Sequence, residues 1–339
     1  MTRIGEEAFV DCASLKSITI PESVTVIDEK VFSGCTSLES ITIPESVTKI
    51  GEWAFEDCTS LKSVVISKLV TDDISTVFRG CASLESIVVA EDNPRYDSRE
   101  GCNAIIETET NTLIAGFKST IIPESVTKIA ERAFNNCTSL ENINIPESVT
   151  SIGAYAFAWC TSLESIIIPK SITEVYIGTF EFCTWLKSIT IPESVTVIDE
   201  KVFSGCTSLE SITIPKSVTK IGEWAFEGCA SLKSVAIPES VTEIGECAFK
   251  NCTSLESIAI PKGVTKIEQR TFKGCTSLTA VTLLAGVKKI EYNVFYECSA
   301  LATIYVPAKK ADYYKKRLPE ELHDTIVELA PEKKAKAKK

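Results

Sequence analysis

The sequence contains very little histidine, and this shortage removes most familiar catalytic chemistry. Its 339 residues include one His, His323, so a Ser–His–Asp or Cys–His arrangement has a single candidate base. The phosphate-binding patterns G-x-x-x-x-G-K-[ST] and G-x-G-x-x-G are also missing. The many Glu residues recur within a repeated P-E-S, which is typical of solvated turns rather than of a converging catalytic pair. We therefore expect no enzyme, no catalytic residues and no cofactor, and a hydrolase is the least favoured function.

Positive charge and long apolar runs are scarce as well. The formal net charge is -11, whereas nucleic-acid phosphates require a basic face, so nucleic acid is not an expected partner. No apolar run approaches the roughly 18 residues that span a membrane. The chain opens with MTRIGEEAF, which is repeat sequence rather than a signal peptide. These features favour a cytoplasmic protein. The alternative is a cell-surface or secreted protein whose upstream part is absent from this sequence.

A period of 23 residues organises most of the chain. Phe recurs at this spacing from Phe9 to Phe78 and again from Phe134 to Phe295; a Cys follows each Phe, and a Leu follows each Cys, always three residues later. Twelve copies keep all three residues within the consensus C-T-S-L-x-S-I-x-I-P-x-S-V-T-x-I-G-x-x-A-F-x-x. A unit this short cannot bury its own apolar side. The copies must therefore stack on one another, which predicts a solenoid.

Each copy predicts two short strands and a helical turn. S-I-T-I-P alternates small polar and β-branched residues, which suits a strand that ends at Pro. V-T-x-I predicts a second short strand on another wall, and G-E-x-A-F-x-x-C changes to helical spacing. The whole pattern resembles the BspA-type class of leucine-rich repeats over residues 1–307. This resemblance implies an α/β, right-handed leucine-rich-repeat solenoid with a parallel sheet, used for binding and often found on microbial surfaces. It supplies no catalytic residues.

Cysteine is abundant, but its spacing suits neither disulfides nor zinc. Twelve of the 14 cysteines are in register, from Cys12 to Cys298. Equivalent residues of stacked coils project in parallel, whereas a disulfide needs converging Cβ vectors and a zinc site needs clustered ligands. We therefore predict a ladder of buried, reduced thiols and no metal site, which favours a reducing compartment. Cys102 and Cys247 are off register. Cys247 occupies a position that is Trp in two other copies, so we expect an exposed thiol there.

One step breaks the period. Cys81 and Cys137 are 137 − 81 = 56 residues apart, which is one period plus 33 residues. The extra residues lie within 91–120, where the apolar runs CNAII and TLIAGF flank the polar turn ETETN. We predict a β-hairpin that leaves the solenoid and returns to it. Such an excursion would be dispensable for the fold.

The period also ends before the chain does. Residues 308–331 predict a C-terminal cap: a helix in AKKADYYKKR, a second turn from Pro319 and a strand in TIVEL. Residues 332–339 form a basic, disordered tail in this prediction. No comparable cap is expected at the N-terminus, where an open sheet edge could pair with another copy of the chain.

Aromatic residues in two adjacent copies replace residues that are polar elsewhere in the repeat. They are Tyr155, Trp159, Tyr176, Phe182 and Trp185. Trp159 and Phe182 share one repeat position, so we expect one to lie above the other. Local repacking of a degenerate repeat is one interpretation. The other is a partner-binding or self-association patch, and it makes these five residues the candidate site.

The patterns together predict a non-enzymatic binding scaffold. A protein is the expected ligand, although the sequence does not identify it. An adhesin that binds glycan or matrix at a cell surface is the alternative, and an upstream export signal would favour it.

Overall fold

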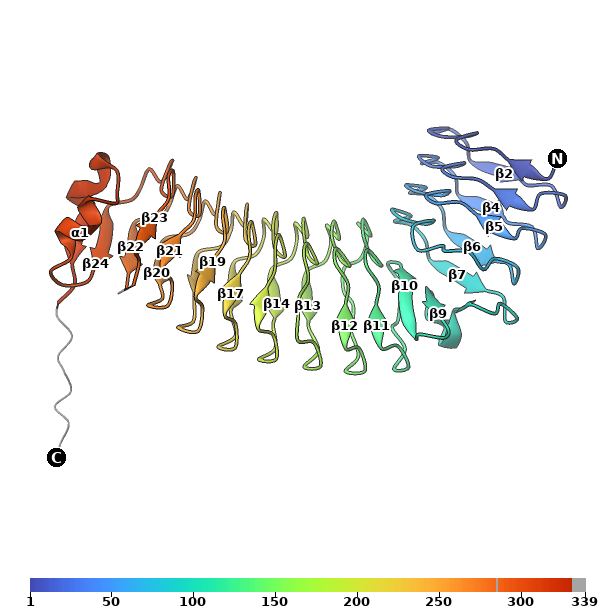
Figure 1. The fold of residues 1–339 in the computed structure, drawn as a ribbon. Helices are drawn as coiled ribbons and strands as arrows, with labels where there is room; N and C mark the ends of the chain where they lie inside the picture. Colours follow the sequence, from blue (N-terminus) through green and yellow to red (C-terminus); the bar gives the residue numbers. More distant parts are fainter. Residues whose placement is uncertain (285, 331–339) are drawn as a thin grey trace, which may run out of the picture. The chain divides into compact units, whose positions relative to one another are not determined.

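The computed structural model of the protein describes residues 1–284 and 286–330. Contacts divide the chain into two compact units, Met1–Ser194 and Val195–Lys339, and each is a stack of coils with one coil per repeat (Figure 1). The parallel-sheet solenoid predicted from the sequence is thus confirmed within each unit. The bounds predicted for solenoid and cap stay predictions, and the basic tail at 332–339 lies outside the described residues.

In each unit the longer strands of the coils lie on one face, which we call the serine face because most of these strands begin at the repeated Ser. In β4 the side chain of Ile41 is buried, whereas Ser40 and Thr42 are exposed. Neighbouring coils pair in register, Ser17 opposite Ser40. The strands of the first unit are β2 (Ser17–Thr19), β4 (Ser40–Thr42), β6 (Ser63–Ile66), β7 (Ser86–Val89), β13 (Ser165–Ile167) and β14 (Ser188–Thr190). Those of the second unit are β16 (Ser211–Thr213), β18 (Ser234–Ala236), β20 (Ser257–Ile260), β22 (Ala280–Leu283) and β24 (Thr303–Val306).

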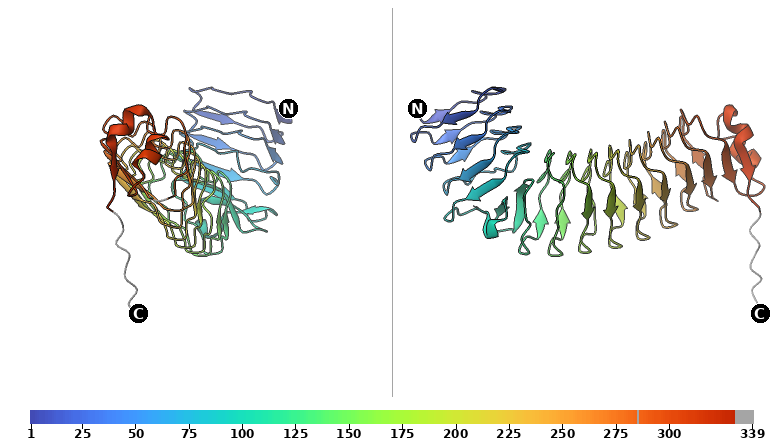
Figure 2. Two further views of the ribbon diagram at one scale, coloured as in Figure 1. Left: turned by 60° about the vertical axis from the view of Figure 1, so that its left-hand side comes forward. Right: turned by 180° about the vertical axis from the view of Figure 1, so that it is seen from behind.

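The second predicted strand is also confirmed and forms a second face in most coils. These strands have two residues, with the Ile or its equivalent turned into the core, as in β5, where Ile50 is buried. In the first unit they are β1 (Arg3–Ile4), β3 (Val26–Ile27), β5 (Lys49–Ile50), β11 (Lys128–Ile129) and β12 (Ser151–Ile152). In the second unit they are β15 (Val197–Ile198), β17 (Lys220–Ile221), β19 (Glu243–Ile244), β21 (Lys266–Ile267) and β23 (Lys289–Ile290). Seen from behind in Figure 2, the coils of the second unit follow one another in the same parallel stack.

The third side of each coil, which we call the turn wall, is a run of separate turns. Ala54 N–H donates to the Gly51 carbonyl at 3.2 Å, and Cys58 N–H donates to the Phe55 carbonyl at 3.2 Å. Left-handed residues such as Trp53 (φ +55°) and Asp57 (φ +54°) separate these turns, so a helix cannot continue through them. The predicted helical turn is therefore present only as single turns. Among the described residues the helices are η1 (Arg99–Gly101), α1 (Ala311–Lys315) and η2 (Glu320–Thr325).

The repeated Phe residues stack into a column in the core of each unit. The rings of Phe32 and Phe55 are parallel, with centroids 5.3 Å apart, and those of Phe226 and Phe249 are 5.2 Å apart. Each such pair contributes roughly 0.5–1.5 kcal/mol beyond the burial of its area. In the first unit the column runs from Phe9 to Phe78 and resumes at Phe134, on the far side of the insertion.

The cysteine ladder lies beside this column, and its thiols tie one coil to the next. Cys58 Sγ donates to the carbonyl of Phe32 in the preceding coil at 3.2 Å, and Cys160 does the same to Phe134. No described cysteine takes part in a disulfide, and all of them are buried except exposed Cys12 and half-buried Cys298. The prediction for Cys247 is wrong: only 3% of this residue is exposed, because its short side chain packs beneath the surface.

We expect native protein to react rapidly with thiol reagents at one site. Cys12 should be alkylated at once because it is exposed, whereas the buried ladder should react only after denaturant is added. Mass spectrometry after brief native alkylation would identify the labelled residue, with Cys12→Ser as the control that removes the fast reaction. Rapid labelling of several ladder positions, or disulfides in the native protein, would contradict this expectation.

The insertion does not leave the solenoid, so that prediction is wrong. Its strands β9 (Ala104–Glu107) and β10 (Thr112–Gly116) form an antiparallel hairpin, flanked by β8 (Tyr96–Asp97) and β11, in the sheet order β12-β11-β10-β9-β8. Ile105, Ile106 and Leu113 are fully buried. A hairpin in solvent would expose alternate residues, whereas these apolar runs are covered on both sides. The extra residues thus extend the second face by two strands.

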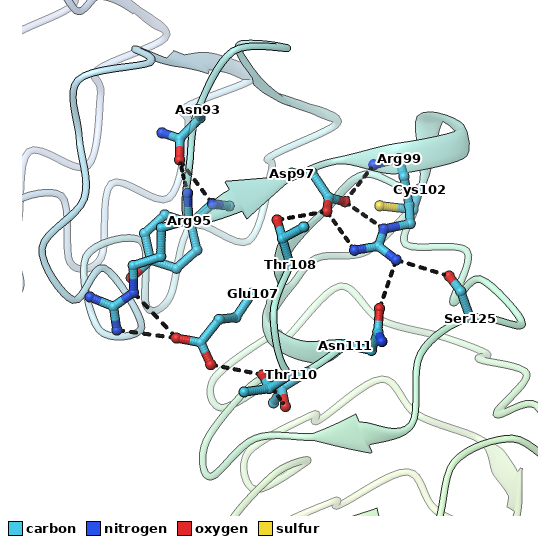
Figure 3. Close-up of polar contacts among 12 residues, drawn as sticks. Asn93, Arg95, Asp97, Arg99, Cys102, Glu107, Thr108, Thr110, Asn111 and Ser125 are labelled. Atoms are coloured by element: carbon cyan, nitrogen blue, oxygen red, sulfur yellow. Dashed lines mark hydrogen bonds and ion pairs between the residues drawn. The ribbon is translucent and has the colours of Figure 1, made fainter.

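A polar network holds the start of this insertion in place (Figure 3). Asn93 Nδ2 donates to the Ser67 carbonyl at 2.9 Å. The Arg99 guanidinium lies 2.5 Å from the Asp97 carboxylate and donates to Asn111 Oδ1 at 2.8 Å. Burial opposes ionisation of Asp97, but the hydrogen bonds from Arg99 and its neighbours outweigh burial and lower the Asp97 pKa. The charged groups of this network pair with each other, so their role is to hold the insertion in place.

The C-terminal cap completes the second unit beyond β24. β25 (Ile326–Glu328) pairs in parallel with β24, so the predicted strand in TIVEL is confirmed. Pro319 precedes η2, as predicted, while α1 is shorter than the predicted helix. Tyr314 and Leu318 are buried against the last coil.

Candidate functional site

The clearest feature of the candidate site is a stacked pair of aromatic rings on the turn wall of the first unit. Trp159 and Phe182 lie on adjacent coils with ring centroids 4.2 Å apart and planes inclined by 26°. The prediction that one lies above the other is confirmed. Trp159 is 44% exposed and Phe182 is half-buried, so the pair offers an apolar surface to solvent.

The backbone at this pair is in a conformation that aromatic residues rarely adopt. Trp159 has φ +64° and Phe182 has φ +56°. The left-handed turn directs the Trp159 N–H to the Glu181 carbonyl of the next coil at 2.7 Å, so stacking itself requires the conformation. Other coils use smaller or polar residues here: Asp11, Gly34, Asp57, Gly80, Asn136, Gly205, Gly228, Asn251, Gly274 and Glu297. A side chain in this region costs about 1–2 kcal/mol, and aromatics lack the local hydrogen bond with which Asn or Asp offsets it.

Tyr155 is explained by local packing. The Arg132 guanidinium lies 5.0 Å from the centre of its ring, and on the other side the ring covers Gly178. A Cβ on Gly178 would come within 2.2 Å of Tyr155, and Gly178 has φ +60°. Tyr155 and Gly178 therefore fit each other as a packing pair, which leaves Tyr155 the weakest of the five candidates.

Tyr176 and Trp185 are exposed on the same two coils. Trp185 is 57% exposed, and the Lys187 ammonium lies 5.6 Å from the centre of its ring. A hydrogen bond with Glu174 raises the pKa of Tyr176. Within the described residues neither side chain makes a ring contact with the Trp159–Phe182 pair. The structure therefore brings two of the five candidates together, while Tyr176 and Trp185 are exposed separately from them.

A second apolar surface was missed by the sequence reasoning. Four aliphatic residues replace the repeated Thr on the outer side of the serine face: Val65, Val88, Ile121 and Ile167. Ile121 is 73% exposed and Ile167 is 71% exposed. Between them, Asn142, Ile143 and Asn144 lie outside any strand and line a groove of about 380 Å³. The signal in the sequence was the change from Thr to Val or Ile at one repeat position.

The described ranges, 1–284 and 286–330, contain neither a cluster of metal ligands nor a long apolar helix. Within them no three His, Cys, Asp or Glu side chains gather closely enough to hold a metal ion. Nor does any of their helices have the length and apolar character needed to cross a membrane. His323 Nε2 lies 3.1 Å from the Leu318 carbonyl, which places the single His in a structural contact of the cap.

Known proteins share both the repeat and the fold. The family model described as BspA type leucine rich repeat region (6 copies) matches residues 1–100, 105–232 and 196–316. No curated protein sequence matches the chain.

Similar solved structures come from bacteria. A leucine-rich repeat protein from Bacteroides ovatus ATCC 8483 is 28% identical, with 97% of this chain and 88% of that chain covered and a TM-score of 0.66. One from Eubacterium ventriosum ATCC 27560 is 27% identical, with 80% of each chain covered and a TM-score of 0.66. A leucine rich cell surface protein from Faecalibacterium prausnitzii A2-165 is 28% identical, covering 92% of this chain and 85% of that chain, with a TM-score of 0.58.

Proposed function

The chain belongs to the BspA-type leucine-rich repeat family, and from this premise we propose that it is a non-enzymatic scaffold that binds a protein through its exposed aromatic residues. The observation that carries the proposal is the Trp159–Phe182 pair. Both residues hold left-handed backbone positions at a cost in stability, although small or polar residues satisfy the same positions in ten other coils. Stacking alone gives no reason for them.

The surroundings of the pair suit a protein partner. Trp and Tyr dominate the energetically important residues of protein interfaces, and Trp185 and Tyr176 add two further exposed rings on the same coils. Each aromatic that becomes buried in a complex would contribute roughly 1.5–3 kcal/mol from its apolar area. A second copy of this chain is the simplest partner, so self-association is tested first.

Restoring the repeat consensus should remove binding without damage to the fold. The variant Trp159→Gly, Phe182→Gly and Trp185→Ser should dissociate more readily in analytical ultracentrifugation, or lose its partner in a pull-down from the source cell. Its melting temperature should stay equal or rise, because Gly relieves the left-handed positions by about 1 kcal/mol each.

Trp224→Lys is the matched control. Trp224 is another Trp at a left-handed position, and Lys30 and Lys201 occupy the equivalent position in other coils. This control should retain association. A triple variant that melts far earlier, with unchanged association and binding, would show that the aromatic residues are needed for packing.

A cell-surface adhesin is the second candidate, favoured by the relative from Faecalibacterium prausnitzii, which is named a leucine rich cell surface protein. Burial of the thiols also weakens the argument for a reducing compartment, since buried thiols are protected from oxidation. The cytoplasmic location remains a prediction. Protease accessibility on intact source cells, followed with an antibody, would distinguish the two locations, and glycan-array binding that survives the triple variant would favour the adhesin.

A further inference from the structure

At the insertion, two coils of the first unit are joined at one end and separated at the other. On the turn wall Asn136 Nδ2 donates to Asp57 Oδ1 at 2.9 Å, across Gly80 of the intervening coil. On the second face, β9 and β10 stand between β8 and β11. These two strands add about 4.8 Å each on that face. The coils must therefore diverge, and in Figure 1 those before and after β9–β10 stack in different directions.

The divergence opens a cavity of about 320 Å³ where the Phe column is interrupted. Phe78, Phe117 and Trp53 supply aromatic walls. In other coils, the carbonyl of the residue before Phe accepts a hydrogen bond from the Phe N–H of the preceding coil. Here that carbonyl belongs to Ala133, and it accepts instead from the Gly116 N–H at 2.8 Å. Inserted chain thus replaces the direct contact between coils, and part of the space between them stays open.

Two polar atoms at this cavity lack hydrogen-bond partners. Arg79 Nε, a donor, and Asn135 Oδ1, an acceptor, are both buried and unpaired. Asn135 is 7% exposed, and its Nδ2 donates to the Ala158 carbonyl at 3.3 Å, which fixes the carboxamide with Oδ1 unused. Buried polar atoms are nearly always paired, so this donor and acceptor together indicate what a ligand must offer.

The charges beside the cavity are already matched. Arg79 Nη1 lies 3.5 Å from the Glu56 carboxylate, and the guanidinium of Arg132 pairs with Glu131. An anionic ligand would compete with these carboxylates. A neutral group that accepts one hydrogen bond and donates another fits better, and a flat ring attached to it would lie against the aromatic walls.

We propose that this cavity binds a small, neutral, planar molecule bearing an amide or lactam group. Its carbonyl oxygen accepts from Arg79 Nε, its N–H donates to Asn135 Oδ1, and its ring contacts Phe78 and Phe117. This site is separate from the Trp159–Phe182 pair and does not depend on the protein-binding function proposed above.

Benzamide is the probe, titrated into the intact chain and followed by isothermal calorimetry and by saturation-transfer NMR. Saturable binding is expected. Benzoate lacks the donor and adds charge, and acetophenone lacks the donor alone, so both should bind about tenfold more weakly. Equal binding of all three probes would overturn the assignment of Asn135, and no saturable binding of benzamide would overturn the site.

Two variants copied from other coils test the partners without disturbing the fold. Asn135→Ala matches Ala158 at the same repeat position, and Arg79→Lys matches Lys250, which pairs with Glu227 there. Each should weaken benzamide binding about tenfold while the melting temperature stays close to the parent value. Trp159→Gly, outside the cavity, should leave benzamide binding unchanged. Benzamide affinity that is unaffected by both cavity variants would contradict the proposal.

Discussion

Raising the pH above 9 is expected to unfold the protein steeply, because the thiol ladder keeps its protons only in the folded state. Burial raises the pKa of Cys58 and of Cys137 to about 12, from 9.0 for an unperturbed thiol. Between these values the unfolded chain releases protons that the folded chain retains. The free energy of unfolding therefore falls as pH rises, whereas below pH 9 the ladder's contribution is fully present.

The expected effect is large because the ladder has many members. Each buried thiol lowers the free energy of unfolding by about 1.4 kcal/mol per pH unit within this window. Burial also raises the pKa values of Cys160 and Cys183 well above the ordinary range, so their contributions add to the same slope. Deprotonation would in addition remove the S–H donors that bond the Phe carbonyls of preceding coils.

Urea unfolding at a series of pH values from about 8 to 11 measures this slope. A variant with Cys58, Cys137 and Cys160 changed to Ala should be less stable at pH 8, because it loses packing and hydrogen bonds. Its free energy of unfolding should nevertheless fall less steeply with pH. The difference in slope should correspond to about three protons, one for each thiol removed. Both proteins contain the same Lys and Tyr residues, so the difference between the two slopes reports on the substituted thiols. An identical slope in the two would show that the thiols do not control the alkaline transition.

The regular part of the fold could be predicted because every copy of the repeat has apolar residues at the same positions. Ile41 and Phe55 recur at fixed positions, and a side chain that must be buried in one coil must be buried in all. What the period did not reveal is the conformation between these positions. The left-handed backbone at Trp53 and Asp57 produces separate turns instead of a helix. The spacing of the apolar residues is the same for a helix and for these turns.

The candidate site could be predicted only in part, for a related reason. A departure from the consensus marks a residue as unusual, but its neighbours decide what it does. Trp159 and Phe182 meet because they share a repeat position, while Tyr155 departs just as much and fits against Gly178. Cys247 likewise replaces a Trp and is buried. The cavity beside Asn135 could not be foreseen, since it arises from the angle between coils.

The insertion shows the same limit most clearly, because the period reveals how many residues are extra but not where they go. Its apolar runs contain the missing information. Ala104, Ile105 and Ile106 are consecutive and all buried, so the strand must be covered on both sides. Continuous burial of this kind distinguishes a strand inside the solenoid from a hairpin in solvent.

Ile106→Asp is expected to unfold the first unit, whereas removal of the whole insertion in register is not. Ile106 is fully buried in β9, and a lone carboxylate there costs roughly 3–5 kcal/mol, a large share of the stability of an ordinary domain. Deletion of residues 90–122 instead joins Val89 to Pro123 and restores 56 − 33 = 23 residues between Phe78 and Phe134. The joined sequence, CASLESIVVPESVTKI, follows the repeat consensus, so Phe78 can stack on Phe134 as Phe55 stacks on Phe78.

Thermal melting followed by far-UV circular dichroism distinguishes the two variants. Ile106→Asp should lose part of the cooperative transition, and Ile106→Val, which shortens the same side chain without charge, should cost only about 0.5–1.5 kcal/mol. The deletion should melt cooperatively and should no longer bind benzamide, since the coils that diverge around the cavity are then in direct contact. If Ile106→Asp melts like the parent, the hairpin is not part of the core. If the deletion variant aggregates, the coils on the two sides of the insertion cannot stack directly on each other. They would then need the inserted strands between them in order to pack.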